Sequence, residues 1–113
     1  MVIGIDYHDT ITKNERLFKR LAAACLNIGI PVYIISALKN PTNVDAKKEV
    51  LRCKVPHTGI ELVYFKDYSE IAELKLAACK RLSVTLMYDD MESVCKLLAK
   101  NGIMTAQVRL SLR

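Results

Sequence analysis

The stretch VIGIDYHDT, residues 2–10, places three ionisable side chains directly after a short apolar run. The apolar part is rich in β-branched residues, as is typical of a strand buried inside a sheet. Asp6, His8 and Asp9 then follow within four positions. The stretch therefore predicts a buried strand whose carboxyl end carries a polar site.

Strands and helices alternate along the rest of the chain. Apolar runs predict five strands, at residues 2–5, 32–35, 61–65, 85–88 and 105–110. Apolar residues at helical spacing predict four helices, which begin near the expected capping residues Thr12 and Ser69, at Thr42 and near Met91. This alternation predicts an α/β fold with three Rossmann-like layers. Its five-stranded parallel sheet, ordered 3-2-1-4-5, would carry helices on both faces.

Length and composition indicate one globular unit over residues 1–113. Hydrophobic residues make up 51% of the chain, which is enough for one core. The segment from residue 21 to 38 is apolar, but Asn27, Gly29 and Pro31 divide it into two elements, so we expect no membrane helix. The net charge of +5 suits an anionic partner but is equally typical of a solvated surface.

The cysteines indicate a reducing environment rather than a metal site. Four cysteines are present and none forms a CxxC pair. Cys53 and His57 have a loosely metal-like spacing, but no second ligand pair follows, which disfavours zinc. No secretory signal pattern opens the sequence. We therefore expect a cytoplasmic protein.

Polar residues recur where the predicted strands end. Ser36 follows the second strand, and Asp89 and Asp90 follow the fourth. In open α/β sheets, ligands bind beyond the carboxyl ends of the strands, so these residues should converge with Asp6. Carboxylates gathered at one edge repel one another unless a divalent cation or a lysine offsets their charge. The pattern predicts a Mg²⁺ site at this edge.

The order of these motifs resembles the haloacid dehalogenase superfamily of phosphohydrolases over nearly the whole chain. That family's first motif is an apolar strand followed by DxDxT, and here it reads DYHDT. Ser36 after VYII resembles the second motif, a lysine the third, and Asp89-Asp90 after TLMY the fourth. The resemblance implies a magnesium-dependent phosphohydrolase that hydrolyses a phosphomonoester through an aspartyl-phosphate intermediate.

The resemblance also implies a role for each residue. Asp6 would be the nucleophile, and Ser36 and Lys75 would hold the phosphoryl oxygens. Asp6, Asp89, Asp90 and a main-chain carbonyl at or near His8 would surround Mg²⁺. Lys80 competes with Lys75 for the third motif. We favour Lys75 because its spacing from Asp89 resembles the family's and because the first turns of its helix lie nearest the site.

His8 departs from the family pattern, because it stands where the phosphatases carry the aspartate that acts as acid and base. An imidazole with a pKa of about 6.5 can donate and accept protons at neutral pH, so His8 is a candidate replacement. Two other interpretations stay open: His8 has no proton-transfer role, or Asp9 substitutes for it. Asp9 itself stands where the family usually has glycine, so it either adds charge at the site or points away.

The chain has no room for the cap domain that family members usually insert. An open site suggests a bulky phosphorylated substrate, such as a nucleic-acid end, or a lid supplied by a second copy in a homo-oligomer. The alternative function is a phosphate- or nucleotide-binding module that has lost turnover. A response-regulator receiver domain fits less well, because its acidic pair belongs early in the chain.

Overall fold

The computed structural model describes residues 1–109, in which five strands alternate with four α-helices and two short helical turns. The elements, in chain order, are β1 (Ile3–Asp6), η1 (Tyr7–Ile11), α1 (Glu15–Asn27), β2 (Val32–Lys39), α2 (Val44–Leu51), β3 (Gly59–Phe65), η2 (Tyr68–Glu70), α3 (Ile71–Leu82), β4 (Leu86–Asp89), α4 (Glu92–Lys100) and β5 (Met104–Gln107).

The five strands form one parallel sheet in the order β3-β2-β1-β4-β5, which confirms the predicted fold class and strand order. The central strand β1 pairs with β2 on one side and with β4 on the other. In this register Asp6 lies opposite Ile35 of β2, and Ile5 lies opposite Tyr88 of β4. The residues that follow these positions on β2 and β4 are Ser36 and Asp89. The register therefore places Ser36 and Asp89 beside Asp6. The prediction that Ser36 follows the end of the second strand is wrong, because β2 continues past it to Lys39.

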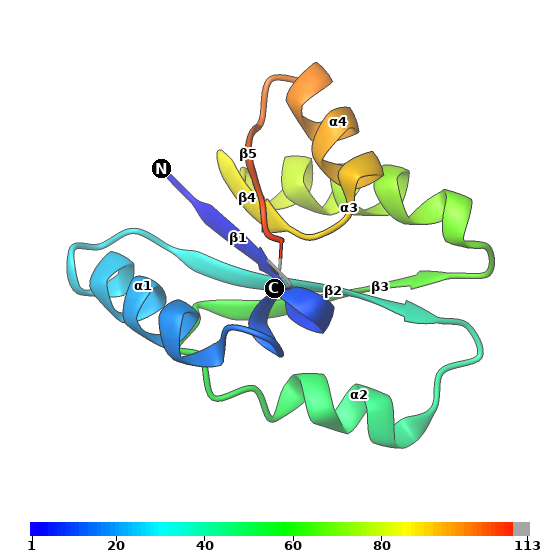
Figure 1. The fold of residues 1–113 in the computed structure, drawn as a ribbon, viewed down its shortest axis with the longest axis horizontal. Helices are drawn as coiled ribbons and strands as arrows, with labels where there is room; N and C mark the ends of the chain where they lie inside the picture. Colours follow the sequence, from blue (N-terminus) through cyan, green and yellow to red (C-terminus); the bar gives the residue numbers. More distant parts are fainter. Residues whose placement is uncertain (110–113) are drawn as a thin grey trace.

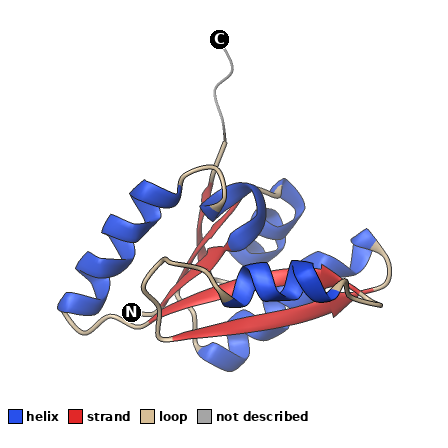
Figure 2. Ribbon diagram, turned by 90° about the horizontal axis from the view of Figure 1, so that it is seen from below, coloured by secondary structure: helices blue, strands red, loops and turns tan. Residues whose placement is uncertain are grey.

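Helices cover both faces of the sheet, as Figure 1 shows: α1 and α2 lie on one side and α3 and α4 on the other. Figure 2 views the molecule from the side of α1 and α2, and helices lie in front of the strands. Each face has its own core. Phe18 of α1 packs against β1 and β2 on the first face, and Leu98 of α4 packs on the second. This three-layer packing explains why β1 is buried along its whole length.

Two predicted helix starts are wrong. The α1 helix begins after Asn14, and the Thr12 hydroxyl instead accepts a hydrogen bond from the Asp9 backbone N–H at 2.9 Å. The capping side chain before α3 is Asp67, not Ser69, because Asp67 and Glu70 form a reciprocal capping box around η2. The predicted fifth strand extends to Leu110, which lies outside the described residues.

No inserted cap domain interrupts residues 1–109, where the segments that join strands and helices are short. The connection from β1 to α1 holds only η1 and three further residues, and the connection from β2 to β3 holds only α2 and its flanking loops. In the same part of the chain, no helix combines the length and the apolar character needed to cross a bilayer.

Candidate functional site

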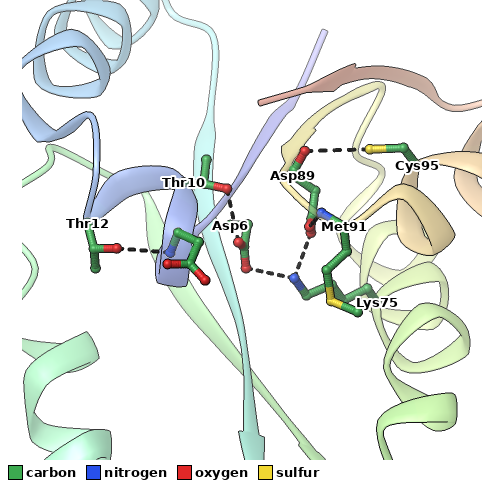
Figure 3. A network of polar contacts seen from close by, with 8 residues as sticks. Asp6, Thr10, Thr12, Lys75, Asp89, Met91 and Cys95 are labelled. Atoms are coloured by element: carbon green, nitrogen blue, oxygen red, sulfur yellow. Dashed lines mark hydrogen bonds and ion pairs between the residues drawn. The ribbon is translucent and has the colours of Figure 1, made fainter. Parts of the chain in front are cut away.

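Three buried charged residues meet at the carboxyl edge of the sheet. Asp6 ends β1, Asp89 ends β4, and Lys75 lies in the second turn of α3. The Lys75 Nζ lies 2.7 Å from Asp6 Oδ1 and 2.6 Å from Asp89 Oδ2, so one ammonium group bridges both carboxylates (Figure 3). The Lys75 side chain is only 2% exposed. Lys80 is exposed on the same helix, so the structure brings Lys75 and not Lys80 into this cluster.

The cluster holds two carboxylates for one ammonium group. The pKa of Asp6 is raised to about 8, mainly by burial and also by the Asp89 charge, although Lys75 opposes both effects. Burial likewise raises the pKa of Asp89. The pKa of Lys75 is raised despite its burial, because both carboxylates favour the ammonium form. The site is therefore electrostatically unbalanced and would be stabilised by additional positive charge.

The remaining carboxylate oxygens have neutral partners. The Thr10 hydroxyl donates to Asp6 Oδ2 at 3.0 Å, and the Met91 backbone N–H donates to Asp89 Oδ1 at 2.9 Å. Figure 3 shows both bonds and the contact from the Cys95 thiol to the Asp89 carbonyl. These contacts hold each carboxylate in one orientation. Thr10 thus steadies the site.

Ser36 lies within β2, beside the end of β1. Its hydroxyl is fully buried and forms no hydrogen bond with any described residue. A buried hydroxyl without a partner carries a desolvation cost of about 1–3 kcal/mol, and a ligand oxygen at this position would remove it. Ser36 has no exposed surface and is not among the residues that line the pocket next to Lys75.

The η1 turn carries the residues that depart from the family pattern. His8 is exposed, and its ring packs edge-on against Tyr7 with the ring centroids 5.0 Å apart. Asp9 has a φ of 62°, a left-handed conformation that favours glycine and that aspartate tolerates better than most residues. Its carboxylate pairs with Lys13 at 3.3 Å. Neither side chain takes part in the buried Lys75 network.

Three of the predicted metal ligands lie close enough to share one ion. Asp6, Asp89 and Asp90 each offer a carboxylate oxygen, and these oxygens lie within 4.8 Å of one another. An all-oxygen donor set suits a hard cation such as Mg²⁺. The His8 imidazole is not part of this group, and the expectation for His8 concerns its main-chain carbonyl. The residues present, with their excess of negative charge, fit a divalent cation.

A pocket of about 300 Å³ opens beside this cluster. Its acidic and basic lining residues are Asp6, His8, Asp9, Lys75 and Asp90. The rest of the lining is apolar and was not expected from the sequence; it consists of Ala37, Phe65, Tyr68, Ile71 and Met91. The sequence did contain a signal for this part of the pocket. Phe65 ends β3 and Tyr68 follows shortly after it, and residues at the carboxyl end of a parallel strand lie at the ligand-binding edge of the sheet.

A scan against models of protein families finds no match, and a search of curated proteins finds none either. Among solved structures, the fold is similar to the crystal structure of an uncharacterized protein from Corynebacterium glutamicum ATCC 13032 Kitasato, with a TM-score of 0.69 and 16% sequence identity. The alignment covers 96% of this chain and 85% of that chain. At this level of identity the similarity shows the fold alone.

Proposed function

We propose that this protein is a magnesium-dependent phosphohydrolase that hydrolyses phosphomonoesters through an aspartyl-phosphate at Asp6. The observation that carries the proposal is the buried bridge from Lys75 to Asp6 and Asp89, with a third carboxylate, Asp90, within reach of the same ion. The excess negative charge favours a site that is completed by a cation and then accepts a phosphate.

When bound, Mg²⁺ would supply positive charge that screens the repulsion between the carboxylates and an incoming phosphate dianion. Asp6, Asp89 and Asp90 would hold it, together with a main-chain carbonyl near His8. The same charge would favour ionised Asp6, whose pKa burial otherwise raises to about 8. The ionised form is the nucleophile that the reaction requires.

In the first step an Asp6 carboxylate oxygen forms a bond to phosphorus as the bond from phosphorus to the leaving oxygen breaks. Thr10 keeps the Asp6 carboxylate oriented by its hydrogen bond to Oδ2. The Ser36 hydroxyl, which has no partner among the described residues, would donate to a phosphoryl oxygen. Lys75 would offset the charge on another phosphoryl oxygen.

Two proton transfers then need a group at the mouth of the pocket. Protonated His8 would give its proton to the departing alkoxide, and neutral His8 would take a proton from the water that attacks phosphorus. That attack breaks the bond to Asp6 and releases phosphate. His8 is exposed and lines the pocket, which supports this role, and its ring is free of hydrogen bonds within residues 1–109.

A phosphate- or nucleotide-binding module is the second candidate function. The observation that favours it is His8 itself, which replaces the acid and base of the resembled phosphatases. Such a module would keep Ser36, Lys75 and the carboxylates but would not break down the intermediate. In either case the absence of a cap within residues 1–109 leaves the pocket open, which suits a bulky substrate such as a nucleic-acid end or a lid from a second copy.

The four cysteines are free, which supports a cytoplasmic location.

The proposal is tested with a generic aryl phosphate in the presence and absence of Mg²⁺. Turnover should require Mg²⁺ and vanish in Asp6→Asn, and His8→Ala should lower it by about 10²- to 10⁴-fold. An aryl leaving group needs little protonation, so the loss in His8→Ala should appear as accumulated aspartyl-phosphate.

His8→Asp supplies the matched variant, because it restores the pattern of the resembled family. A large rise in turnover relative to the wild type would identify the natural protein as a weakened hydrolase or a binding module. No magnesium-dependent turnover in either form, over a panel of phosphorylated metabolites and nucleic-acid ends, would refute the hydrolase and leave the binding module.

A further inference from the structure

The pocket beside Lys75 is lined by two kinds of residue, which we call its polar half and its apolar half. Its polar half holds the carboxylates and the ammonium group, which suit Mg²⁺ and a phosphate. Its apolar half is built from Phe65 at the end of β3, Tyr68 in η2 and Ile71 at the start of α3. A phosphate group is polar and would gain nothing from contact with the apolar half. We therefore expect another part of the ligand, one that is apolar, to contact these residues.

Tyr68 is the exposed member of this apolar half. Its exposed fraction is 69%, whereas Phe65 beneath it is 5% exposed. The two rings lie with their centroids 5.0 Å apart and their planes tilted by 44°. Tyr68 thus contacts the buried Phe65 ring and keeps a large part of its own surface open to solvent. An exposed ring at the border of a pocket offers a surface against which another ring can pack.

The turn that carries Tyr68 is held by hydrogen bonds on both sides. Asp67 Oδ1 accepts from the Ser69 backbone N–H at 2.9 Å. Glu70 Oε1 accepts from the backbone N–H of Asp67 at 2.8 Å and of Lys66 at 3.1 Å. A turn ordered in this way before the ligand arrives loses little conformational entropy on binding. Its position is therefore set by the fold and not by the ligand.

We propose that Tyr68 selects phosphate ligands that carry an aromatic ring close to the phosphate group. The inference rests on the proposed function for the position of the phosphate, at Asp6 and Lys75. With the phosphate there, the group attached to it can extend along the apolar half of the same pocket, over Phe65, Ile71 and Met91. A ring in that place would pack against Tyr68 in an offset or edge-to-face arrangement.

Two sources can supply this chemistry: a ring one carbon from the phosphate oxygen, as in benzyl phosphate, or a base one sugar away, as in a nucleoside 5′-monophosphate. Hydrolysis of two matched pairs distinguishes them. Benzyl phosphate is compared with cyclohexylmethyl phosphate, and adenosine 5′-monophosphate with ribose 5-phosphate. Each pair has a primary alcohol as leaving group, so the ratio of kcat/KM within a pair reports the ring and not the chemistry.

Binding measured without turnover makes the test independent of hydrolysis. Calorimetry with Mg²⁺ compares benzylphosphonate with cyclohexylmethylphosphonate, which cannot be hydrolysed. The wild type should prefer the aromatic member by about 2- to 10-fold, the usual range for a pair of aromatic rings. Tyr68→Leu should bring the ratio close to one, and Tyr68→Phe should keep it. Tyr64→Leu is the control, because Tyr64 is also an exposed tyrosine of this region but does not line the pocket.

The outcomes separate this inference from the proposed function. Turnover that requires Asp6 but shows no ring preference in either pair, or a preference that survives Tyr68→Leu, overturns the inference and leaves the hydrolase standing. A ring preference that depends on Tyr68 in phosphonate binding, without any turnover, supports the inference and refutes the hydrolase. If neither phosphonate binds, the inference is overturned.

Discussion

Replacing Lys75 with methionine should strongly destabilise the metal-free protein. The lysine is 2% exposed and lies within 2.7 Å of both Asp6 and Asp89, so its removal leaves two buried carboxylates that face each other. Each would keep one neutral hydrogen-bond donor, the Thr10 hydroxyl or the Met91 N–H. Methionine has a similar length and is apolar, so the variant removes the charge without opening a large cavity.

The size of the effect follows from the cost of breaking a buried ion pair. Removing one partner of such a pair costs about 3–5 kcal/mol, because the other charge is left buried and uncompensated. For a chain of this length, about 4 °C of melting temperature corresponds to 1 kcal/mol, so Tm should fall by about 12–20 °C. The loss is not doubled for two carboxylates, since one of them can take up a proton.

The loss should depend on pH. A carboxyl group whose pKa is raised in the folded state destabilises the protein as pH increases above its unfolded value of about 3.9. The stability of the wild type should already decrease with increasing pH in this way, because burial raises the pKa of Asp6 to about 8. Without Lys75 the pKa values of Asp6 and Asp89 rise further. The difference in the free energy of unfolding between the variant and the wild type should therefore be smallest near pH 5 and largest near pH 8.

Urea unfolding at pH 5 and pH 8, with a chelator present, measures this difference. Lys80→Met on the same helix is the control, because Lys80 is exposed and its loss should change stability by less than about 0.5 kcal/mol. Added Mg²⁺ should restore part of the stability of Lys75→Met by neutralising the carboxylates. If the free energy of unfolding of Lys75→Met at pH 8 lies within about 1 kcal/mol of the wild-type value, Lys75 does not compensate the charge of the buried carboxylates, and the reasoning is refuted.

Two further predictions concern the metal ligands and the central strand. Asp89→Asn should weaken Mg²⁺ binding at least about tenfold in calorimetry, whereas Asp45→Asn on α2 should leave it unchanged; equal affinities would remove Asp89 from the ligand set. Gly4→Ala should lower the free energy of unfolding by about 1–3 kcal/mol, because a Cβ there would lie 2.7 Å from the buried Met87 sulfur. Gly59→Ala should lower the free energy of unfolding by less in the same experiment, because the added Cβ would lie 3.3 Å from its nearest neighbour, a carbon of the Tyr33 ring.

Much of the fold could be predicted from local sequence patterns. The β-branched runs before Asp6 and Ser36 could only be buried strands, and their alternation with amphipathic helices allowed few topologies. The position of Lys75 in the early turns of its helix was enough to choose it over Lys80, because the geometry of a helix after a parallel strand places those turns near the site. These features depend on spacing along the chain, which the sequence contains directly.

The helix starts depended on local hydrogen bonds that residue type alone does not select, and the distances at the site depended on the tertiary structure. Thr12 and Ser69 are good capping residues by type, but the η1 turn uses the Thr12 hydroxyl for Asp9, and Asp67 with Glu70 closes the turn before α3. The sequence by itself determined that Asp6 and Asp89 stand at strand ends, but not that β2 continues past Ser36. Only the tertiary structure decided that one ammonium group bridges Asp6 and Asp89, that the Ser36 hydroxyl is buried and unpaired, and that Tyr68 faces the same pocket. Those relations depend on the packing of α3 against the sheet, which joins residues far apart in the chain.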